Sequence, residues 1–85
     1  MKFKSHKKFE KQYEKLPKAI KSKFLLRLEM FRENQSASVL NIHQLHGDRK
    51  PLLSMNITGD YRALFLMNKD TVTFYEIGTH SELYE

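Results

Sequence analysis

The clearest structural signal in this 85-residue chain is LSMNITGDYRALFLM, residues 53–67. Apolar and polar side chains alternate on both sides of Thr58-Gly59-Asp60, a pattern typical of two antiparallel strands joined by a turn. A three-residue turn places Leu53 opposite Phe65, so that apolar side chains from both strands share one face. The segment therefore predicts a β-hairpin with a defined register.

The same register sends polar side chains to the other face of the hairpin. Asn56 and Arg62 are expected opposite each other there, with Asp60 beside them in the turn. We expect helices to cover the apolar face and to leave this second face bare. A bare face with an arginine at its centre is a candidate binding surface.

Further strands extend the predicted sheet on both sides of the hairpin. After the turn signal at 68–70, one face is expected to hold Val72, Phe74 and Glu76, and the other Thr73, Tyr75 and Ile77. A strand at 41–46 and an N-terminal strand containing Phe3 are also expected. The result is a twisted, mainly antiparallel sheet.

The first third of the chain has a helical period instead. Apolar side chains recur at steps of three and four: Phe9, Tyr13, Leu16, Ile20, Phe24, Leu28 and Phe31. Pro17 interrupts this stripe, since proline favours the first turn of a helix and disfavours a helical residue before it. We predict helices near 5–15 and 17–33, with Ser5 capping the first and Asn34 leaving the second in a left-handed turn. The fold class is α+β: a helical hairpin on one face of the sheet, a short C-terminal helical turn, and a single domain over 1–85.

Composition and charge limit the classes of function. There is no cysteine, which excludes disulfides, thiolate metal sites and a thiol nucleophile. The sequence shows neither a secretion signal nor an apolar run near the roughly 18 residues of a membrane span, so we expect a cytoplasmic location. Residues 1–32 carry nine Lys and two Arg against three Glu, a net charge of +8, whereas residues 33–85 carry −3. Such a basic segment favours a polyanion or an acidic protein partner.

Histidines are the candidate proton-transfer groups. His6 lies in the basic first helix, where a solvated surface role is expected. His43 and His46 are three residues apart, and on an extended strand they would point to opposite faces, which makes a poor metal pair. His80 follows the last strand directly after Gly78 and Thr79. A strand end is a rigid place for a general acid or base.

Three segments together resemble a known protein family: HQLHG at 43–47, GDYRALF at 59–65 and IGTHSELY at 77–84. They are similar to the RelE/ParE superfamily of toxins from type II toxin–antitoxin systems, and most closely to its YafQ-like branch. The resemblance implies the same fold from end to end. It also implies a metal-independent endoribonuclease that cleaves mRNA during translation on the ribosome, with no cofactor.

The resemblance also implies roles for individual residues. His80 stands at the position of a catalytic histidine and is expected to be the general acid, with Arg62 stabilising the phosphate. His43 or Asp60 is the general base, or Asp60 orients a histidine. Tyr84 stands where the family carries an aromatic residue, and we expect its ring to stack on an RNA base. Asn56 occupies the place of a further histidine in YafQ, a departure from the pattern, and the remaining substrate-binding candidates are Asn56, His46, Arg49 and Lys50.

Other interpretations stay open at this point. In the alternative interpretation, Arg62 pairs with Asp60 or Glu76, Asp60 only forms the turn, and Tyr84 only packs. The alternative functions are inhibition of DNA gyrase, as in ParE-type toxins, and a degenerate toxin that binds without catalysis. The expected partners are mRNA, the ribosome and a cognate antitoxin that is acidic and partly disordered when free, with no membrane partner.

Overall fold

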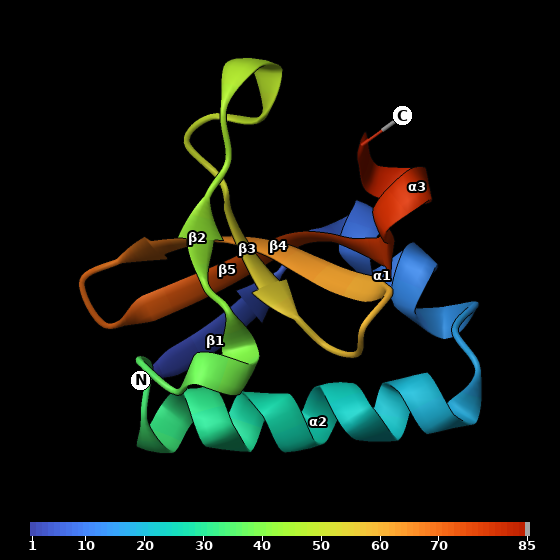
Figure 1. Ribbon diagram of the computed structural model, residues 1–85, viewed down its shortest axis with the longest axis horizontal. Helices are drawn as coiled ribbons and strands as arrows, with labels where there is room; N and C mark the ends of the chain where they lie inside the picture. Colours follow the sequence, from blue (N-terminus) through green and yellow to red (C-terminus); the bar gives the residue numbers. More distant parts are fainter. Residues whose placement is uncertain (85) are drawn as a thin grey trace.

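A five-stranded sheet forms the centre of the molecule, with α2 beneath it and α3 on the opposite side (Figure 1). A computed structural model describes residues 1–84. The strands are β1 (Lys2–Ser5), β2 (His43–Gln44), β3 (Leu53–Asn56), β4 (Tyr61–Asn68) and β5 (Thr71–Thr79). The helices are α1 (Lys7–Glu14), α2 (Lys18–Glu33) and α3 (His80–Tyr84), with 3-10 turns η1 (Ser38–Leu40) and η2 (Gly47–Arg49). Within the described residues, no helix has the length and apolarity that crossing a lipid bilayer requires.

The sheet has the strand order β1-β5-β4-β3-β2. β1 runs parallel to β5, and the other neighbouring strands are antiparallel. Leu53 pairs with Phe65, and the Ile57 amide donates a hydrogen bond to the Tyr61 carbonyl oxygen at 2.9 Å. The α+β fold class and the register of the hairpin are therefore confirmed.

The two N-terminal helices separate at Pro17, as predicted, and Pro17 itself precedes the first residue of α2. α1 begins later than expected because Ser5 belongs to β1 and pairs with Phe74, so the prediction of Ser5 as a cap is wrong. The prediction for Asn34 is also wrong, since its φ is −153°. Asn41, at the end of η1, has a left-handed backbone instead, with a φ of 45°.

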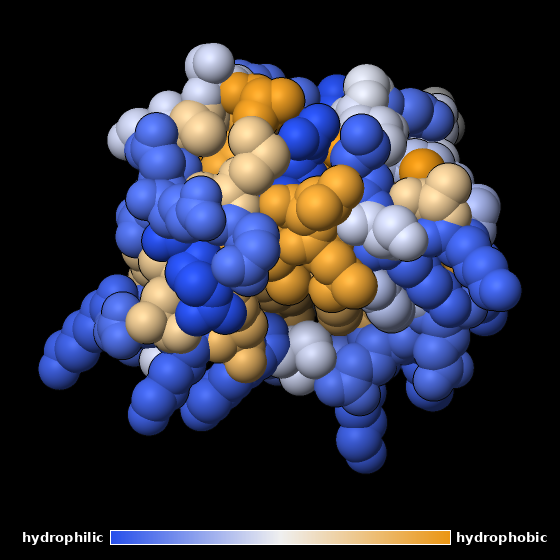
Figure 2. Space-filling model, turned by 90° about the horizontal axis from the view of Figure 1, so that it is seen from below, coloured by the Kyte–Doolittle hydropathy of each residue, from blue (hydrophilic) through white to orange (hydrophobic). Residues whose placement is uncertain are grey.

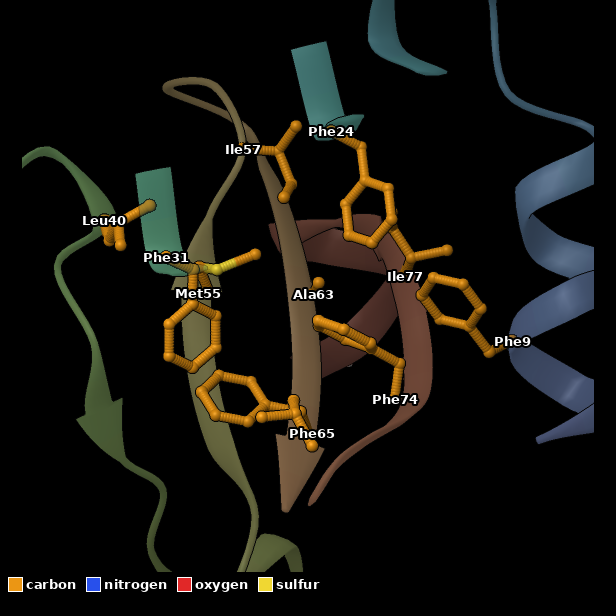
Figure 3. Close-up of a cluster of buried hydrophobic side chains, with 11 residues drawn as sticks. Phe9, Phe24, Phe31, Leu40, Met55, Ile57, Ala63, Phe65, Phe74 and Ile77 are labelled. Atoms are coloured by element: carbon orange, nitrogen blue, oxygen red, sulfur yellow. The ribbon is translucent and has the colours of Figure 1, made fainter. Parts of the chain in front are cut away.

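The aromatic stripe of the helices packs into the main core, on the side of the sheet that faces α2. Figure 3 shows Phe9 and Phe24 from the helices gathered around Phe74 from β5. The ring centroids of Phe24 and Phe74 are 5.3 Å apart, and those of Phe65 and Phe74 are 5.6 Å apart. T-shaped and tilted aromatic pairs of this kind stabilise the fold beyond the area they bury. The core role predicted for this stripe is confirmed.

A β-bulge in β5 changes which side chains reach this core. Ile77 pairs with Ala63 and Glu76 with Leu64, but Phe65 already pairs with Phe74, which leaves one extra residue in β5. The predicted alternation is therefore wrong beyond Phe74. The extra residue allows Ile77 to join Phe74 in the core and turns Glu76 to the other side of the sheet.

The face of the sheet opposite α2, called the outer face below, is partly covered. Leu45, Leu64 and Leu83 form a second buried cluster there, and Ser54 is fully buried. α3 and the connection between β2 and β3 provide this cover. The expectation of a wholly bare face is therefore wrong, and only the parts beside this cluster stay open.

Candidate functional site

A hollow of about 330 Å³ lies on the outer face beside α3. Its lining includes five of the residues that the sequence singled out, which are His43, His46, Arg62, His80 and Tyr84. The other lining residues are Asn41, Gln44 and Leu45. The fold thus gathers two histidines from the 43–47 segment, the arginine of the hairpin and the C-terminal histidine around one space.

His80 is placed by a capping box at the start of α3. The Glu82 amide donates to Thr79 Oγ1 at 3.2 Å, and the Thr79 amide donates to Glu82 Oε1 at 2.8 Å. The pattern T-x-x-E satisfies amide groups that would otherwise be free at a helix start. The His80 amide donates to the Asp60 carbonyl oxygen at 2.9 Å, so the helix start is also tied to the β3–β4 turn. Thr79 and Glu82 were not predicted to position His80, although the T-x-x-E spacing indicates a helix start.

Gly78 provides the space that this capping box needs. A Cβ at position 78 would lie 2.9 Å from Glu82 Oε1, which is closer than the two atoms can pack. Gly78 also pairs with Arg62 across the sheet. The absence of a side chain here therefore lets Glu82 fold back over the end of β5.

Tyr84 both packs and faces the hollow. Its hydroxyl donates to Oγ of the buried Ser54 at 3.2 Å, which anchors the ring over the outer face. Its ring centroid lies 4.5 Å from that of His80, with an interplanar angle of 50°. Tyr84 therefore packs on the outer face, as one interpretation of the sequence allowed, and it also presents an aromatic surface next to His80.

Arg62 is held by the turn that precedes it. Its Nη1 donates to the carbonyl oxygens of Thr58 and Gly59 at 3.0 Å each and to that of Tyr61 at 3.2 Å. Within residues 1–84 its hydrogen bonds all come from Nη1, so Nη2 and Nε remain for a ligand. The alternative of a pair with Glu76 is wrong, because that carboxylate is bound by other cations.

His43 has a defined tautomer. Its Nδ1 lies 2.8 Å from the Asn41 carbonyl oxygen. A carbonyl oxygen only accepts, so Nδ1 carries the proton and Nε2 of the neutral ring is left as an acceptor. His43 and His46 were expected on opposite faces of a strand, but both line this hollow. In the part of the chain described, no group of three or more His, Cys, Asp or Glu is arranged to hold a metal ion.

Four predicted site residues lie outside the hollow, and Asp60 and Asn56 are two of them. The Asp60 side chain is exposed and is not among the groups that line the hollow; its contribution is the backbone carbonyl that binds the His80 amide. Asn56 is also outside the lining, and its Oδ1 is buried without a hydrogen-bond partner among residues 1–84. The structure therefore does not bring these two side chains to the three histidines.

Arg49 and Lys50 have different environments. Arg49 Nη1 lies 2.5 Å from Glu76 Oε2, and its Nη2 donates to the Leu83 carbonyl oxygen. Arg49 thereby ties η2 to both β5 and α3, while its neighbour Lys50 is exposed. Neither lines the hollow, so their predicted contact with substrate stays a prediction.

The hollow combines the groups that acid–base cleavage of a phosphodiester needs. A neutral imidazole with a free Nε2 accepts a proton, a second imidazole donates one, and a guanidinium stabilises charge on phosphoryl oxygens. An aromatic ring beside the second imidazole offers a stacking surface for a base. The site is open to solvent, as a polymer substrate requires.

Comparison with known proteins adds a relationship of fold. No family model and no curated protein matches this sequence. YafQ from Escherichia coli strain BL21(DE3) superposes with a TM-score of 0.82 at 17% identity, over 98% of this chain and 97% of that one. This is the RelE/ParE toxin fold.

Other structures with the RelE/ParE toxin fold match over nearly the same length. The YoeB/ParE toxin from Agrobacterium tumefaciens gives a TM-score of 0.75 at 16% identity, over 94% of this chain and 99% of that one. RelE of Pyrococcus horikoshii, solved as a RelE–RelB complex, gives 0.71 at 21% identity over 92% of each chain. YafQ has also been solved in a DinJ–YafQ toxin–antitoxin complex. The RelE/ParE-like architecture expected from the three sequence segments is confirmed.

Proposed function

We propose that this protein is the toxin of a type II toxin–antitoxin system and a metal-independent endoribonuclease that cleaves mRNA on the translating ribosome. The observation that carries the proposal is that His80, Arg62 and His43, far apart in the sequence, line one open hollow. The RelE/ParE toxin fold supports it, since YafQ and RelE share this arrangement of elements.

The proposed reaction is attack of a ribose 2′-hydroxyl on the adjacent phosphorus. His43 Nε2 removes the proton from the 2′-oxygen as this oxygen bonds to phosphorus. Arg62 donates from Nη2 and Nε to the phosphoryl oxygens while negative charge accumulates on them. The His80 imidazolium protonates the departing 5′-oxygen, and the products are a 2′,3′-cyclic phosphate and a free 5′-hydroxyl.

Of the two candidate bases, the geometry favours His43 over Asp60. The Asn41 carbonyl oxygen accepts from His43 Nδ1 and so orients the ring, which in its neutral form presents Nε2 as the acceptor, whereas the Asp60 side chain does not line the hollow. Asp60 acts instead through its backbone, by holding the His80 amide. Tyr84, next to His80, stacks on a base near the scissile bond.

The test is cleavage of a translated message by purified variants. We expect His80→Ala and His43→Ala to lower the cleavage rate by about 10²- to 10⁴-fold each, the usual contribution of an acid or base. Asp60→Asn is the matched control and should retain most of the activity. Undiminished cleavage by His80→Ala would remove this residue from the mechanism.

The same experiment addresses the ParE-type alternative. If expression of the protein arrests translation first, a ribonuclease is supported; if DNA damage signalling comes first with no message cleavage, a gyrase inhibitor is supported. Growth arrest that depends on His80 also argues against a degenerate toxin.

The proposed antitoxin fits the helical side of the molecule. Leu25 and Leu26 of α2 are 56% and 61% exposed, and Figure 2 shows an apolar patch bordered by hydrophilic side chains on the side that carries α2. An exposed apolar patch of this kind marks an interaction site. The net charge of +8 in residues 1–32 attracts an acidic partner and speeds its association. The similar structures solved as DinJ–YafQ and RelE–RelB complexes support such a partner.

A further inference from the structure

We infer that the outer face carries a second RNA-binding surface, at the β1–β5 edge of the sheet and separate from the hollow around His80. We call it the edge strip and define it by Lys2, Lys4, His6, Lys69 and Tyr75. It binds the phosphodiester backbone of single-stranded RNA on its lysines and stacks a base on its aromatic pair. The choice of RNA as the ligand rests on the proposed function.

Alternate side chains of β1 lie on the outer face of the sheet. In the parallel pairing with β5, Lys2 lies beside Thr71 and Lys4 beside Thr73. Phe3, between the two lysines, packs against the core ring of Phe74, with centroids 6.2 Å apart. Because strand side chains alternate, both lysines point to the outer face, as does His6 in the extended backbone that follows.

The edge strip carries positive charge from three lysines. Lys2, Lys4 and Lys69 line a shallow hollow of about 570 Å³, whose other lining residues are Asn68, Asp70, Thr71 and Thr73. The nearby carboxylates already have partners: Asp70 binds the N-terminal ammonium at 3.1 Å, and Glu76 binds Lys8 at 3.3 Å and Arg49 at 2.5 Å. In residues 1–84 the three lysines form no ion pair. Their positive charge is thus available to a polyanion.

The edge strip also contains a pair of aromatic rings, His6 and Tyr75. The His6 ring lies 4.1 Å from the Tyr75 ring, with an interplanar angle of 32°. Tyr75 is at the bulge of β5 and has no place in the main core, and His6 is exposed. Aromatic rings next to a basic track are the usual means of holding single-stranded nucleic acid without reading its sequence.

The edge strip and the hollow around His80 are separate parts of the outer face. The strip lies along β1, β5 and the β4–β5 turn, whereas the hollow is lined by residues of the 41–46 segment, by Arg62 of β4 and by His80 and Tyr84 of α3. A five-stranded sheet is roughly 20 Å wide at the usual strand spacing. The lysines are spread along two elements rather than focused on one point, which suits consecutive phosphates better than a single small anion.

The test is the affinity for a short, unstructured, fluorescently labelled RNA, measured by anisotropy across a series of salt concentrations. All proteins carry His80→Ala so that the probe stays intact. The charge variant is Lys2→Gln/Lys4→Gln/Lys69→Gln. Its matched control, Lys11→Gln/Lys15→Gln/Lys18→Gln, removes the same charge from exposed positions in and beside α1 and α2. Tyr75→Ala tests stacking, and Tyr75→Phe keeps the ring.

We expect the strip variant to weaken RNA binding about tenfold or more. It should also reduce the slope of log affinity against log salt by about 2, since each lost phosphate contact on a single strand removes about 0.7. Tyr75→Ala should weaken binding about 5- to 100-fold, with Tyr75→Phe close to the parent protein. The control variant should change affinity less than about threefold.

Two outcomes would overturn the inference. Equal losses in the strip and control variants would show a general effect of charge, and unchanged RNA affinity with weaker binding of an acidic antitoxin segment would make the strip a protein-binding surface. Cleavage is scored separately with His80 intact. If the strip variant loses RNA affinity but the protein with His80 intact does not cleave RNA, the edge strip is supported as an RNA-binding surface and the proposed enzymatic function fails.

Discussion

The two faces of the sheet are stabilised in different ways. The face toward α2 holds a continuous core of 11 buried residues, mostly aromatic and aliphatic. The outer face has a buried cluster of only three, Leu45, Leu64 and Leu83, and depends on individual polar bonds from Arg49, Glu82 and Tyr84. Stability therefore comes mainly from apolar area on one face and from a few specific contacts on the other, where a site can stay open.

The largest effect should come from truncating the main core. Phe65→Ala removes a fully buried ring and should lower the free energy of unfolding by about 3–5 kcal/mol. Leu66→Ala changes the next residue of the same strand, which is only partly buried, and should cost about 1 kcal/mol or less. Urea unfolding of both variants measures the difference. Equal losses would mean that the outer face carries as much packing as the helix side.

An intermediate effect is expected at Arg49, the residue that ties η2 to β5 and α3. Arg49→Gln removes the pair with Glu76 and the bond to the Leu83 carbonyl, and should lower the free energy of unfolding by about 1–2 kcal/mol. Lys50→Gln, at the exposed neighbouring position, should change it by less than about 0.5 kcal/mol. Thermal unfolding of the two variants decides the matter. If Arg49→Gln weakens RNA binding and leaves stability unchanged, Arg49 serves the substrate instead.

The smallest effect concerns the junction of β5 and α3. A Cβ at position 78 would press against Glu82 Oε1, so Gly78→Ala should displace Glu82 from the capping box. Removal of Glu82 in Glu82→Ala should cost about 1 kcal/mol by itself, as for other lost caps. In a double-mutant cycle, Gly78→Ala should lower the free energy of unfolding by roughly 0.5–1 kcal/mol less in the Glu82→Ala background than in the unsubstituted protein. Strict additivity would mean that the two residues do not compete for the space.

Several features of this protein are readable from local sequence. Apolar residues at every second position on both sides of Thr58-Gly59-Asp60 specify the hairpin register, because a slip of one residue would move this set of side chains to the wrong face. Pro17 divides the helical stripe because proline restricts the residue before it. His80 follows a strand that ends in Gly78, and the resemblance of the 77–84 segment to the RelE/ParE toxins singles it out. These predictions depend only on neighbours within a few residues.

The rest depends on contacts between segments that are distant in the chain. No local pattern marks Tyr75 as the bulged residue, because a bulge is chosen by how β5 must pair with β4 while both Phe74 and Ile77 are buried. The cover over the outer face likewise joins Leu45 to Leu83. Alternation along an isolated strand also cannot show that His43 and His46 line the same hollow.

The chemical identity of the site thus comes from the residue types in the chain, whereas the set of side chains that meet comes from packing. The sequence names an imidazole, a guanidinium and an aromatic ring, but it also names Asp60, whose side chain the fold leaves outside the hollow. Glu76 turns toward Arg49 and not toward Arg62, because the bulge and η2 bring that pair together. The periodicity of the sequence determines which face of a helix or strand each side chain occupies. Only the burial of apolar area between elements determines which of these faces meet.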